Sequence, residues 1–312
     1  MISSKNILIT GGTGSLGNAL TKKYLKDESI KRIVIYSRCE FKQFVMQQEI
    51  EDKEDKIRYF IGDVRDQSRL KMAMKNVDIV IHTAALKQVP AIEYNPFEAI
   101  KTNVLGTMNI IESAIHNNVQ KVLFISTDKA VNPINLYGAS KMCAEKLILD
   151  ANNYTGWKDT LFSCVRYGNV TGSRGSILPK FKSITNGVYP ITDLEMTRFW
   201  MTLADACKVV DDALRLMKGG EIFIPEMKSY KITDMVNAIN PEGIFDVVGI
   251  RKGEKLHEEM LNEDEKRNVA MIENYFVVDS KHDIEKIYID EYSSKETEKM
   301  TVEEIREKIR GL

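Results

Sequence analysis

The stretch KNILITGGTGSLG at residues 5–17 decides the fold of this chain. A short apolar run ends in a glycine-rich turn, and a sequence compatible with a helix follows. Glycine lets the backbone turn tightly and approach a pyrophosphate, whose charge is favoured by the free N–H groups and the dipole of a helix N-terminus. A glycine pattern alone is a weak signal, but between a strand and a helix it predicts a dinucleotide site rather than a merely structural turn. The turn residues predicted to contact the dinucleotide are Gly11, Thr13, Gly14, Ser15, Leu16 and Gly17.

Short apolar runs rich in β-branched residues recur after this turn. They occupy residues 33–36, 57–61, 77–81, 122–125 and 161–165. Helix-length segments with a 3.6-residue apolar period separate most of them. This alternation predicts an α/β fold built on a Rossmann-type doubly wound parallel sheet. The later sequence is mixed, which predicts a smaller C-terminal α+β substrate lobe.

The same pattern sets the expected domain boundaries. Residues 1–170 form the dinucleotide-binding Rossmann domain, and residues 201–225, a helical stretch followed by a short strand, return to it. Residues 171–200 and 226–312 form the substrate lobe. No Pro-, Gly- or Ser-rich linker separates the two parts, so we expect them to pack closely.

Composition and charge exclude several classes of function. Lys and Arg total 44 and Asp and Glu total 45, and this formal net charge of −1 disfavours nucleic-acid binding. No apolar run approaches the ~20 residues that span a bilayer, and no secretion signal is recognisable, so we expect no membrane association. The four cysteines lie far apart without a CxxC pair, which predicts reduced thiols and a cytoplasmic location. The four histidines have no metal-ligand spacing, so we expect no metal.

Ser37 and Arg38 follow the second predicted strand, where a dinucleotide fold contacts the cofactor ribose. A hydroxyl and a guanidinium suit a 2′-phosphate through charge-assisted hydrogen bonds, which favours NADP over NAD. Glu40 lies nearby and leaves NAD open.

The spacing of the three turn glycines also resembles that of the short-chain dehydrogenase/reductase family. In that family, residues after the third and fourth strands hold the adenine and the cofactor backbone. The matching residues here are Asp63, Val64, Ala84 and Ala85. Asp63 could instead cap a helix.

Tyr137 and Lys141 form a YxxxK pair after the fifth predicted strand. Residues four apart lie on one face of a helix, so the two side chains should project together. A nearby ammonium would lower the pKa of the phenol and make it a usable base near neutral pH. In this context the pair resembles the catalytic and cofactor-contacting pair of short-chain dehydrogenases, with Thr127 at the usual hydroxyl position.

Longer motifs resemble one family within the extended short-chain dehydrogenase/reductase superfamily. They are TDKAVNPINLYG at 127–138, AALK at 84–87, RYGNV at 166–170, GSRGS at 172–176, MTRFW at 196–200 and GEKLHE at 253–258. Over at least residues 5–260 the chain is similar to the inverting UDP-N-acetylglucosamine 4,6-dehydratases, which open pseudaminic acid biosynthesis. Lys252 replaces a proline of the family motif and Gln88 replaces a usual histidine. We expect these two departures to alter binding slightly and not the reaction type.

The resemblance implies a redox-neutral lyase reaction. C4 of the sugar is oxidised, the C5 proton is removed, the C6 hydroxyl leaves, and the hydride returns to C6. It assigns Tyr137 as the base at O4, Lys141 as the group that orients the nicotinamide ribose, Lys129 as the C5 base and Asp128 as the acid for the C6 hydroxyl. For these roles the carboxyl must be protonated and the amine neutral. The expected product is UDP-2-acetamido-2,6-dideoxy-β-L-arabino-hex-4-ulose, inverted at C5.

The resemblance also implies the substrate contacts. Arg198 and Arg251 would bind the diphosphate, Asn169 the sugar or its phosphate, and Glu254 the uridine ribose. Lys87 and Arg174 complete the predicted substrate-binding set. Each charged residue could alternatively form a surface ion pair of little energetic consequence. The family further implies a homo-oligomer, such as a hexamer.

Four other functions stay open at this point. A C4 epimerase needs no acid–base pair at C5 and C6, and retaining dehydratases carry Asp-Glu where this chain has Asp128-Lys129. Capsule-type 4,6-dehydratases with 5-epimerase activity carry methionine in place of Tyr137. A non-catalytic NADP-binding regulator would be expected to lose Tyr137 or Lys141, and both are present.

Overall fold

A computed structural model describes residues 5–156, 159–279, 281–282 and 284–311, and its centre is a nine-stranded sheet. Seven strands are parallel: β1 (Lys5–Thr10), β2 (Ile30–Ser37), β3 (Ile57–Ile61), β4 (Ile79–His82), β5 (Lys121–Ile125), β6 (Leu161–Val165) and β9 (Ile222–Pro225). They are ordered β3-β2-β1-β4-β5-β6-β9. The order reverses between β1 and β4, which is where doubly wound sheets bind ligands. The predicted Rossmann-type sheet is confirmed.

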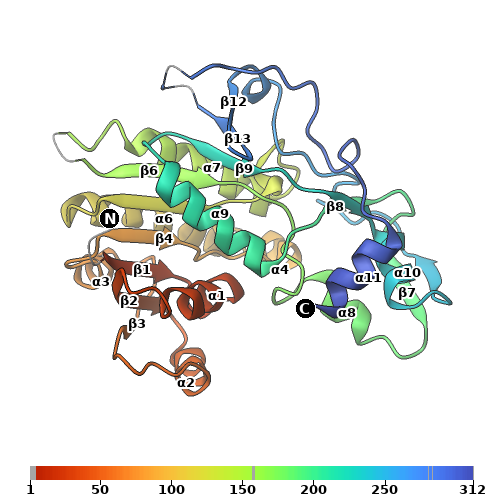
Figure 1. The fold of residues 1–312 in the computed structure, drawn as a ribbon, viewed down its shortest axis with the longest axis horizontal. Helices are drawn as coiled ribbons and strands as arrows, with labels where there is room; N and C mark the ends of the chain where they lie inside the picture. Colours follow the sequence, from red (N-terminus) through yellow and green to blue (C-terminus); the bar gives the residue numbers. More distant parts are fainter. Residues whose placement is uncertain (1–4, 157–158, 280, 283, 312) are drawn as a thin grey trace.

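Helices cover both faces of this sheet (Figure 1). α1 (Ser15–Tyr24) packs beside α9 (Leu203–Leu216). α6 (Gly106–His116) packs against both α3 (Gln67–Ala73) and α7 (Leu136–Ala151). The remaining helices of this part are α2 (Glu40–Glu49), α4 (Val89–Tyr94), α5 (Pro96–Ala99), a π-helical turn η1 (Ile100–Leu105) and a 3₁₀ turn η2 (Asp128–Ala130).

A smaller lobe lies beside the sheet, at the right of Figure 1. It contains α8 (Ile177–Lys182), β7 (Val188–Ile191), β8 (Thr197–Phe199), β10 (Ser229–Lys231), α10 (Ile232–Ile239), β11 (Ile244–Val247) and α11 (Val302–Arg310). Two two-stranded sheets, β8 with β10 and β7 with β11, join its segments. The lobe has a separate hydrophobic core that includes Phe181, Trp200, Met235 and Ile305.

One segment predicted to belong to the lobe lies in the main sheet instead. β12 (Val269–Ile272) and β13 (Tyr275–Val278) form an antiparallel hairpin that pairs with β9 and extends the sheet. The 3₁₀ turn η3 (Glu265–Arg267) precedes it. Without this hairpin, buried β9 would present an unpaired hydrophobic edge, which proteins avoid. The return of residues 201–225 to the sheet, through α9 and β9, follows the prediction.

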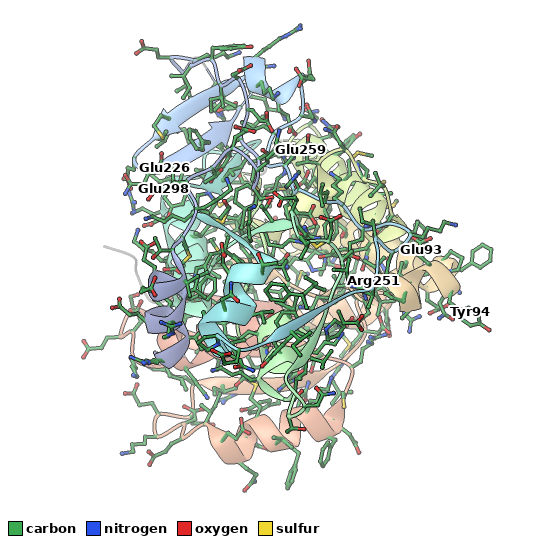
Figure 2. The ribbon with its side chains drawn as sticks, turned by 90° about the vertical axis from the view of Figure 1, so that its right-hand side faces the viewer. Glu93, Tyr94, Glu226, Arg251, Glu259 and Glu298 are labelled. Atoms are coloured by element: carbon green, nitrogen blue, oxygen red, sulfur yellow. The ribbon has the colours of Figure 1, made fainter. Side chains whose placement is uncertain are left out.

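Among the described residues, no helix combines the length and the apolar character needed to cross a membrane. Large apolar side chains are exposed along α4, α5 and η1, and Tyr94 projects from the body of the molecule (Figure 2).

Candidate active site

The glycine-rich turn between β1 and α1 has no room for side chains. Gly11 has a left-handed φ of +63°, and a Cβ there would lie 2.9 Å from the backbone of Ala84. A Cβ on Gly17 would lie 2.4 Å from the carbonyl oxygen of Gly12. Gly14 caps α1 without a side-chain hydrogen bond, so the N–H groups of the first turn stay available to an anion. These features fit a dinucleotide pyrophosphate.

Arg174 contacts this turn rather than the substrate cavity. Its backbone N–H donates to Ser15 Oγ (3.0 Å) and its Nη1 donates to the carbonyl of Thr13 (3.2 Å). It does not line the large cavity described below. The structure therefore places Arg174 on the cofactor side, unlike the sequence prediction.

The end of β2 brings together the residues expected at the adenosine ribose. The Arg38 guanidinium is half-exposed and lies 3.8 Å from Asp63. Burial alone would raise the pKa of Asp63, but hydrogen bonds from Arg65 (2.7 and 2.9 Å) outweigh burial and hold that pKa below its usual value. Asp63 does not cap α3, because Asp66 does so by accepting a hydrogen bond from the backbone N–H of Arg69.

Packing and hydrogen bonds position the other predicted cofactor residues. Val64 is buried against Gly106, and Ser37 Oγ accepts a hydrogen bond from Gln43 Nε2 (3.0 Å). The loop after β4, which carries Ala84, Ala85 and Lys87, is fixed by buried Asn103. The Asn103 amide bonds both backbone groups of Leu86 (2.8 and 2.9 Å). Sequence reasoning missed Asn103, because its partner is 17 residues away in the chain.

Tyr137 and Lys141 lie on the first turns of α7, where Asn135 caps the helix by accepting from the N–H of Gly138 (2.8 Å). Lys141 Nζ donates to the carbonyl of Ile125 (2.6 Å) and sits 3.8 Å from the centroid of the Phe124 ring. Burial lowers the pKa of Lys141 to about 7.

The expected lowering of the Tyr137 pKa by Lys141 is not found. Burial raises the pKa of the Tyr137 phenol to about 12, against an opposing effect of the Lys129 charge. A hydrogen bond with Thr127 also lowers it, and Lys141 is not among the groups that change it. The physical reason is that the Lys141 ammonium is directed at a backbone carbonyl and an aromatic ring.

Asp128 and Lys129 lie side by side at the end of β5. Asp128 is completely buried, and its Oδ1 accepts from Thr127 Oγ1 (2.8 Å) and Lys129 Nζ (3.0 Å). Within the described residues, Asp128 Oδ2 is buried without a hydrogen-bond partner. Lys129 Nζ also donates to Asn169 Oδ1 (3.0 Å) and lies 3.3 Å from Glu258 Oε1.

The predicted neutral state of Lys129 is wrong for this arrangement. Burial alone would lower the pKa of Lys129, but the charges of Asp128 and Glu258 outweigh burial and raise that pKa above its ordinary value. The amine is therefore an ammonium with three acceptors around it. Sequence reasoning assigned no role to Glu258, although it closes the GEKLHE motif.

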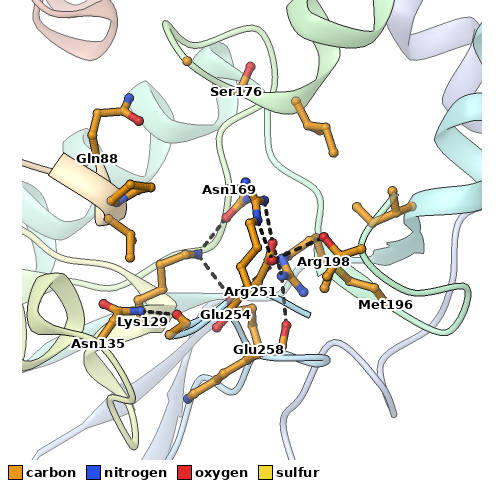
Figure 3. A pocket seen from close by; sticks show the side chains of 18 of the residues that line it. Gln88, Lys129, Asn135, Asn169, Ser176, Met196, Arg198, Arg251, Glu254 and Glu258 are labelled. Atoms are coloured by element: carbon orange, nitrogen blue, oxygen red, sulfur yellow. Dashed lines mark hydrogen bonds and ion pairs between the residues drawn. The ribbon is translucent and has the colours of Figure 1, made fainter. Parts of the chain in front are cut away.

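A cavity of about 530 Å³ lies between the sheet and the lobe (Figure 3). Its wall contains six residues that sequence analysis placed at the substrate or its chemistry: Lys87, Lys129, Asn169, Arg198, Arg251 and Glu254. Buried Glu258 also lines it. Desolvation and the nearby Lys129 charge lower the pKa of Lys87.

The two arginines of the cavity differ in what they contact. Arg251 is exposed and forms a two-bond ion pair with Glu254 (3.0 and 3.1 Å). Arg198 is buried and donates to the carbonyls of Lys255 (2.9 Å) and Leu256 (3.1 Å). Arg198 thus supports the chain segment behind the cavity wall, whereas Arg251 is the more accessible of the two for a diphosphate.

One group of three potential metal ligands lies outside this cavity. Atoms of Glu221, Asp279 and His282 come within 4.8 Å of one another. Ser163 Oγ donates to Glu221 (2.6 Å), and His282 Nδ1 pairs with Asp279 (2.7 Å). Their hydrogen-bonding capacity is thus used within the protein, and we assign no metal to them.

The strand order, the glycine-rich turn and the YxxxK pair on α7 together define an extended short-chain dehydrogenase/reductase. Residues 7–280 match the family described as "Polysaccharide biosynthesis protein", and the chain belongs to this family.

Individual relatives are similar over most of the chain. A protein of Campylobacter jejuni subsp. jejuni serotype O:23/36 (strain 81-176), named UDP-N-acetylglucosamine 4,6-dehydratase (inverting), is 50% identical over 89% of this chain and 84% of its own. A protein of Rickettsia bellii (strain OSU 85-389), named UDP-glucose 4-epimerase, is 39% identical over 100% of this chain and 97% of its own. The X-ray structure of Pen from Bacillus thuringiensis has a TM-score of 0.94 at 38% identity, covering 100% and 98% of the two chains. The resemblance to inverting dehydratases that the motifs indicate is confirmed.

Proposed function

We propose that this chain is an NADP-dependent lyase that converts UDP-N-acetylglucosamine to UDP-2-acetamido-2,6-dideoxy-β-L-arabino-hex-4-ulose with inversion at C5. The proposal depends most on the position of Lys129. This residue lies in the cavity wall, and its Nζ is 3.0 Å from Asp128 Oδ1. The 50% identity to a relative with this name supports it. Such a product enters pseudaminic acid biosynthesis.

The residues around Asp128 support a route for the proton released at O4. Tyr137 takes this proton, and Thr127 connects the phenol to Asp128 Oδ1, 2.8 Å from the Thr127 hydroxyl. Asp128 then carries the proton that must go to the departing C6 hydroxyl. When bound, NADP⁺ accepts hydride from C4 and later returns it to C6.

Proton transfer to Asp128 also prepares Lys129 as a base. A protonated Asp128 no longer stabilises the neighbouring ammonium, so the pKa of Lys129 falls toward the range in which it can lose a proton. The ammonium gives its proton to solvent water in the cavity, and neutral Lys129 then takes the C5 proton while the C6 hydroxyl leaves as water with the proton from Asp128. A solvent proton added to the opposite face of C5, as hydride is returned to C6, then gives the L configuration.

The rival function is a C4 epimerase, because one relative that spans the whole chain has the name UDP-glucose 4-epimerase. An epimerase needs Tyr137 and the cofactor but no acid and base at C5 and C6. The cluster of Asp128, Lys129 and Glu258 at the cavity favours the dehydratase.

Incubation with UDP-N-acetylglucosamine in deuterated water, followed by NMR, separates the two functions. We expect a 6-deoxy-4-keto sugar with the L configuration and deuterium at C5. Lys129→Ala should retain C4 oxidation but lose C5 exchange, whereas Tyr137→Phe should bind the substrate and produce no reduced cofactor. A C4 epimer without loss of the C6 hydroxyl would establish the epimerase instead.

For the cofactor, the half-exposed Arg38 supports NADP through its reach to a 2′-phosphate. Denatured protein should release NADP(H), and Arg38→Ala should weaken binding of NADP⁺ by roughly tenfold or more, about 1.4 kcal/mol, with little effect on NAD⁺. Calorimetric titration of both nucleotides measures this. Equal weakening of both would show that Arg38 does not select the phosphate. Independently of that result, Arg174 joins the proposed cofactor-binding set in place of the substrate set, because it contacts the glycine-rich turn.

A further inference from the structure

We infer that Glu258 is a positioning residue for Lys129 and that it connects the nucleotide end of the cavity to the proton-transfer end. This inference rests on the proposed function and extends it to a residue that neither the motif resemblance nor the family assignment gives a role.

The environment of Glu258 is that of a functional carboxylate. Its side chain is 2% exposed, yet it lines the cavity. Oε1 lies 3.3 Å from Lys129 Nζ and 3.7 Å from Arg198 Nε. Oε2 is buried without a hydrogen-bond partner within the described part of the chain. A buried carboxylate oxygen without a partner is costly and is uncommon outside functional sites.

Three acceptors surround the Lys129 amine, and each comes from a different part of the fold. Asp128 follows β5, Asn169 follows β6, and Glu258 belongs to the C-terminal region. Figure 3 shows Asn169 and Glu258 with Lys129. Among these three, Glu258 alone ties the lysine to the segment that forms the opposite wall. The direction of the amine therefore depends on where this segment lies.

The segment from residue 251 to 258 is held as a unit. Asn135 Nδ2 donates to the carbonyl of Gly253 (2.7 Å), and Lys255 Nζ donates to that of Val131 (2.7 Å). Arg198 holds the carbonyls of Lys255 and Leu256. These bonds anchor the segment between the Arg251–Glu254 pair and Glu258, so the position of the segment sets the position of Glu258.

The Arg251–Glu254 pair occupies the other end of the same unit. If this pair binds the nucleotide portion of the substrate, as proposed above, nucleotide binding fixes the unit and with it Glu258 and Lys129. Binding energy from the non-reacting part of a substrate is used in this way when it orients the reacting groups. A bare sugar phosphate would lack this effect.

Glu258→Gln tests the inference, because it removes the charge and keeps the shape. We expect kcat and the rate of C5 deuterium exchange to fall together by about tenfold or more, while the Kd for UDP changes by less than about twofold. Formation of reduced cofactor on addition of UDP-N-acetylglucosamine should persist. Glu258→Asp keeps the negative charge but moves it away from Lys129, because its side chain is shorter. This variant should show a smaller loss of the same kind.

Glu259→Gln is the matched control. Glu259 is the partly exposed neighbour of Glu258 (Figure 2). It accepts a hydrogen bond from Asn132 Nδ2 (2.8 Å). Its variant should keep wild-type values in every assay. Parallel loss of UDP binding, cofactor reduction and thermal stability in Glu258→Gln would instead make Glu258 a purely structural ion-pair partner and overturn the inference. Undiminished C5 exchange would also overturn it.

A second measurement does not depend on the reaction. Acetylation of Lys129 by acetic anhydride, followed by peptide mass spectrometry, should be several-fold faster in Glu258→Gln than in the wild type, since an ammonium that loses a carboxylate partner gives up its proton more easily. Equal labelling would contradict the inference. If the wild type produces no 6-deoxy sugar, the proposed function fails, while the labelling result still decides whether Glu258 controls Lys129.

Discussion

Lys141 is buried almost completely, with its amine beside Ile125 and Phe124 of β5. Its exposed fraction is 3%, and burial lowers its pKa to about 7, whereas in the unfolded chain a lysine titrates near 10.4. Between these values the unfolded state binds one more proton than the folded state. The free energy of unfolding therefore rises with pH across this window. The buried ammonium destabilises the folded state to its full extent only below pH ~7, where Lys141 is charged in both states.

This predicts a pH-dependent effect of Lys141→Met. The variant removes the buried charge, so its stability relative to the wild type should be greatest at pH 6 and should decline by on the order of 2 kcal/mol by pH 9. Urea unfolding at both pH values measures this difference, with Lys146→Met on the exposed face of α7 as the surface control. A difference that stays constant or grows with pH would contradict the assigned charge state.

At the residue scale, sequence predicts which side chains meet but not their charge. Tyr137, Asp128 and Lys129 are recognisable from local motifs, and the structure places them together. Their pKa values depend on partners that are distant in sequence. Glu258 lies 129 residues after Lys129, and no local pattern connects the two. The directions predicted for Tyr137 and Lys129 were therefore wrong, although the residues were found.

At the scale of elements, a buried arginine joins the main sheet, α7 and the segment that leads into the terminal hairpin. Arg166 directly follows β6 and makes two-bond ion pairs with Glu145 of α7 (2.8 and 3.0 Å) and Glu265 of η3 (both 2.8 Å). It also donates to the carbonyl of Met260 (2.8 Å). Burial alone would raise the pKa of Glu265, but Arg166 outweighs burial and holds it below its usual value.

Arg166→Met should destabilise the protein by about 3–5 kcal/mol near pH 8, because two buried carboxylates lose their partner. The loss should shrink as the pH falls. Arg166 holds the pKa of Glu265 below its usual value, so this carboxylate stays ionised in the wild type at pH 5, whereas the buried carboxylates of the variant have no cation and take up protons, which removes the penalty of a buried charge. Denaturant unfolding at pH 5 and pH 8 tests both statements.

Arg215→Met is the matched control for this experiment. Arg215 is 53% exposed and pairs with Glu273 (2.7 Å), so its loss should change the free energy of unfolding very little. If the two arginine variants were equally destabilised, the buried network would not be a determinant of stability.

The parallel strands are the elements that sequence predicts best. Apolar runs at 33–36, 57–61, 122–125 and 161–165 fall inside β2, β3, β5 and β6, because strands covered on both faces are apolar throughout. The hairpin of β12 and β13 was missed. Its strands have four residues each, and β13 pairs with β9 at residues that are at least 50 positions apart, such as Tyr275 with Pro225, so neither length nor alternation identifies their sheet.

At the scale of the molecule, the cavity depends on segments that sequence cannot bring together. The glycine-rich turn and the catalytic motifs lie on the sheet, whereas residues 251–258 come from the other wall. The motif resemblance predicts roles for Arg251 and Glu254. Only the fold shows that the same segment also places Glu258 beside Lys129. The segment of residues 251–258 therefore supplies Glu258 to the proposed catalytic cluster and Arg251 and Glu254 to the proposed nucleotide-binding wall.

The exposed apolar surface of α4, α5 and η1 supports the predicted homo-oligomer. Its large side chains include Tyr94 (87% exposed), Phe97 (79%) and Leu105 (45%), and Tyr94 projects clear of the body (Figure 2). Apolar side chains gathered in this way on one surface usually mark an interaction site, and identical chains most often associate with closed symmetry.

Light scattering should therefore give a mass that is a multiple of 35.6 kDa. Phe97→Ser combined with Leu105→Ser should shift the protein toward the monomer, because a hydroxyl at each position removes apolar area that the interface would bury. Tyr154→Ser, at an exposed tyrosine after α7, is the control and should leave the mass unchanged. A wild-type mass of 35.6 kDa at micromolar concentration would refute the oligomer, whereas an oligomer that survives the double substitution would place its interface on another face.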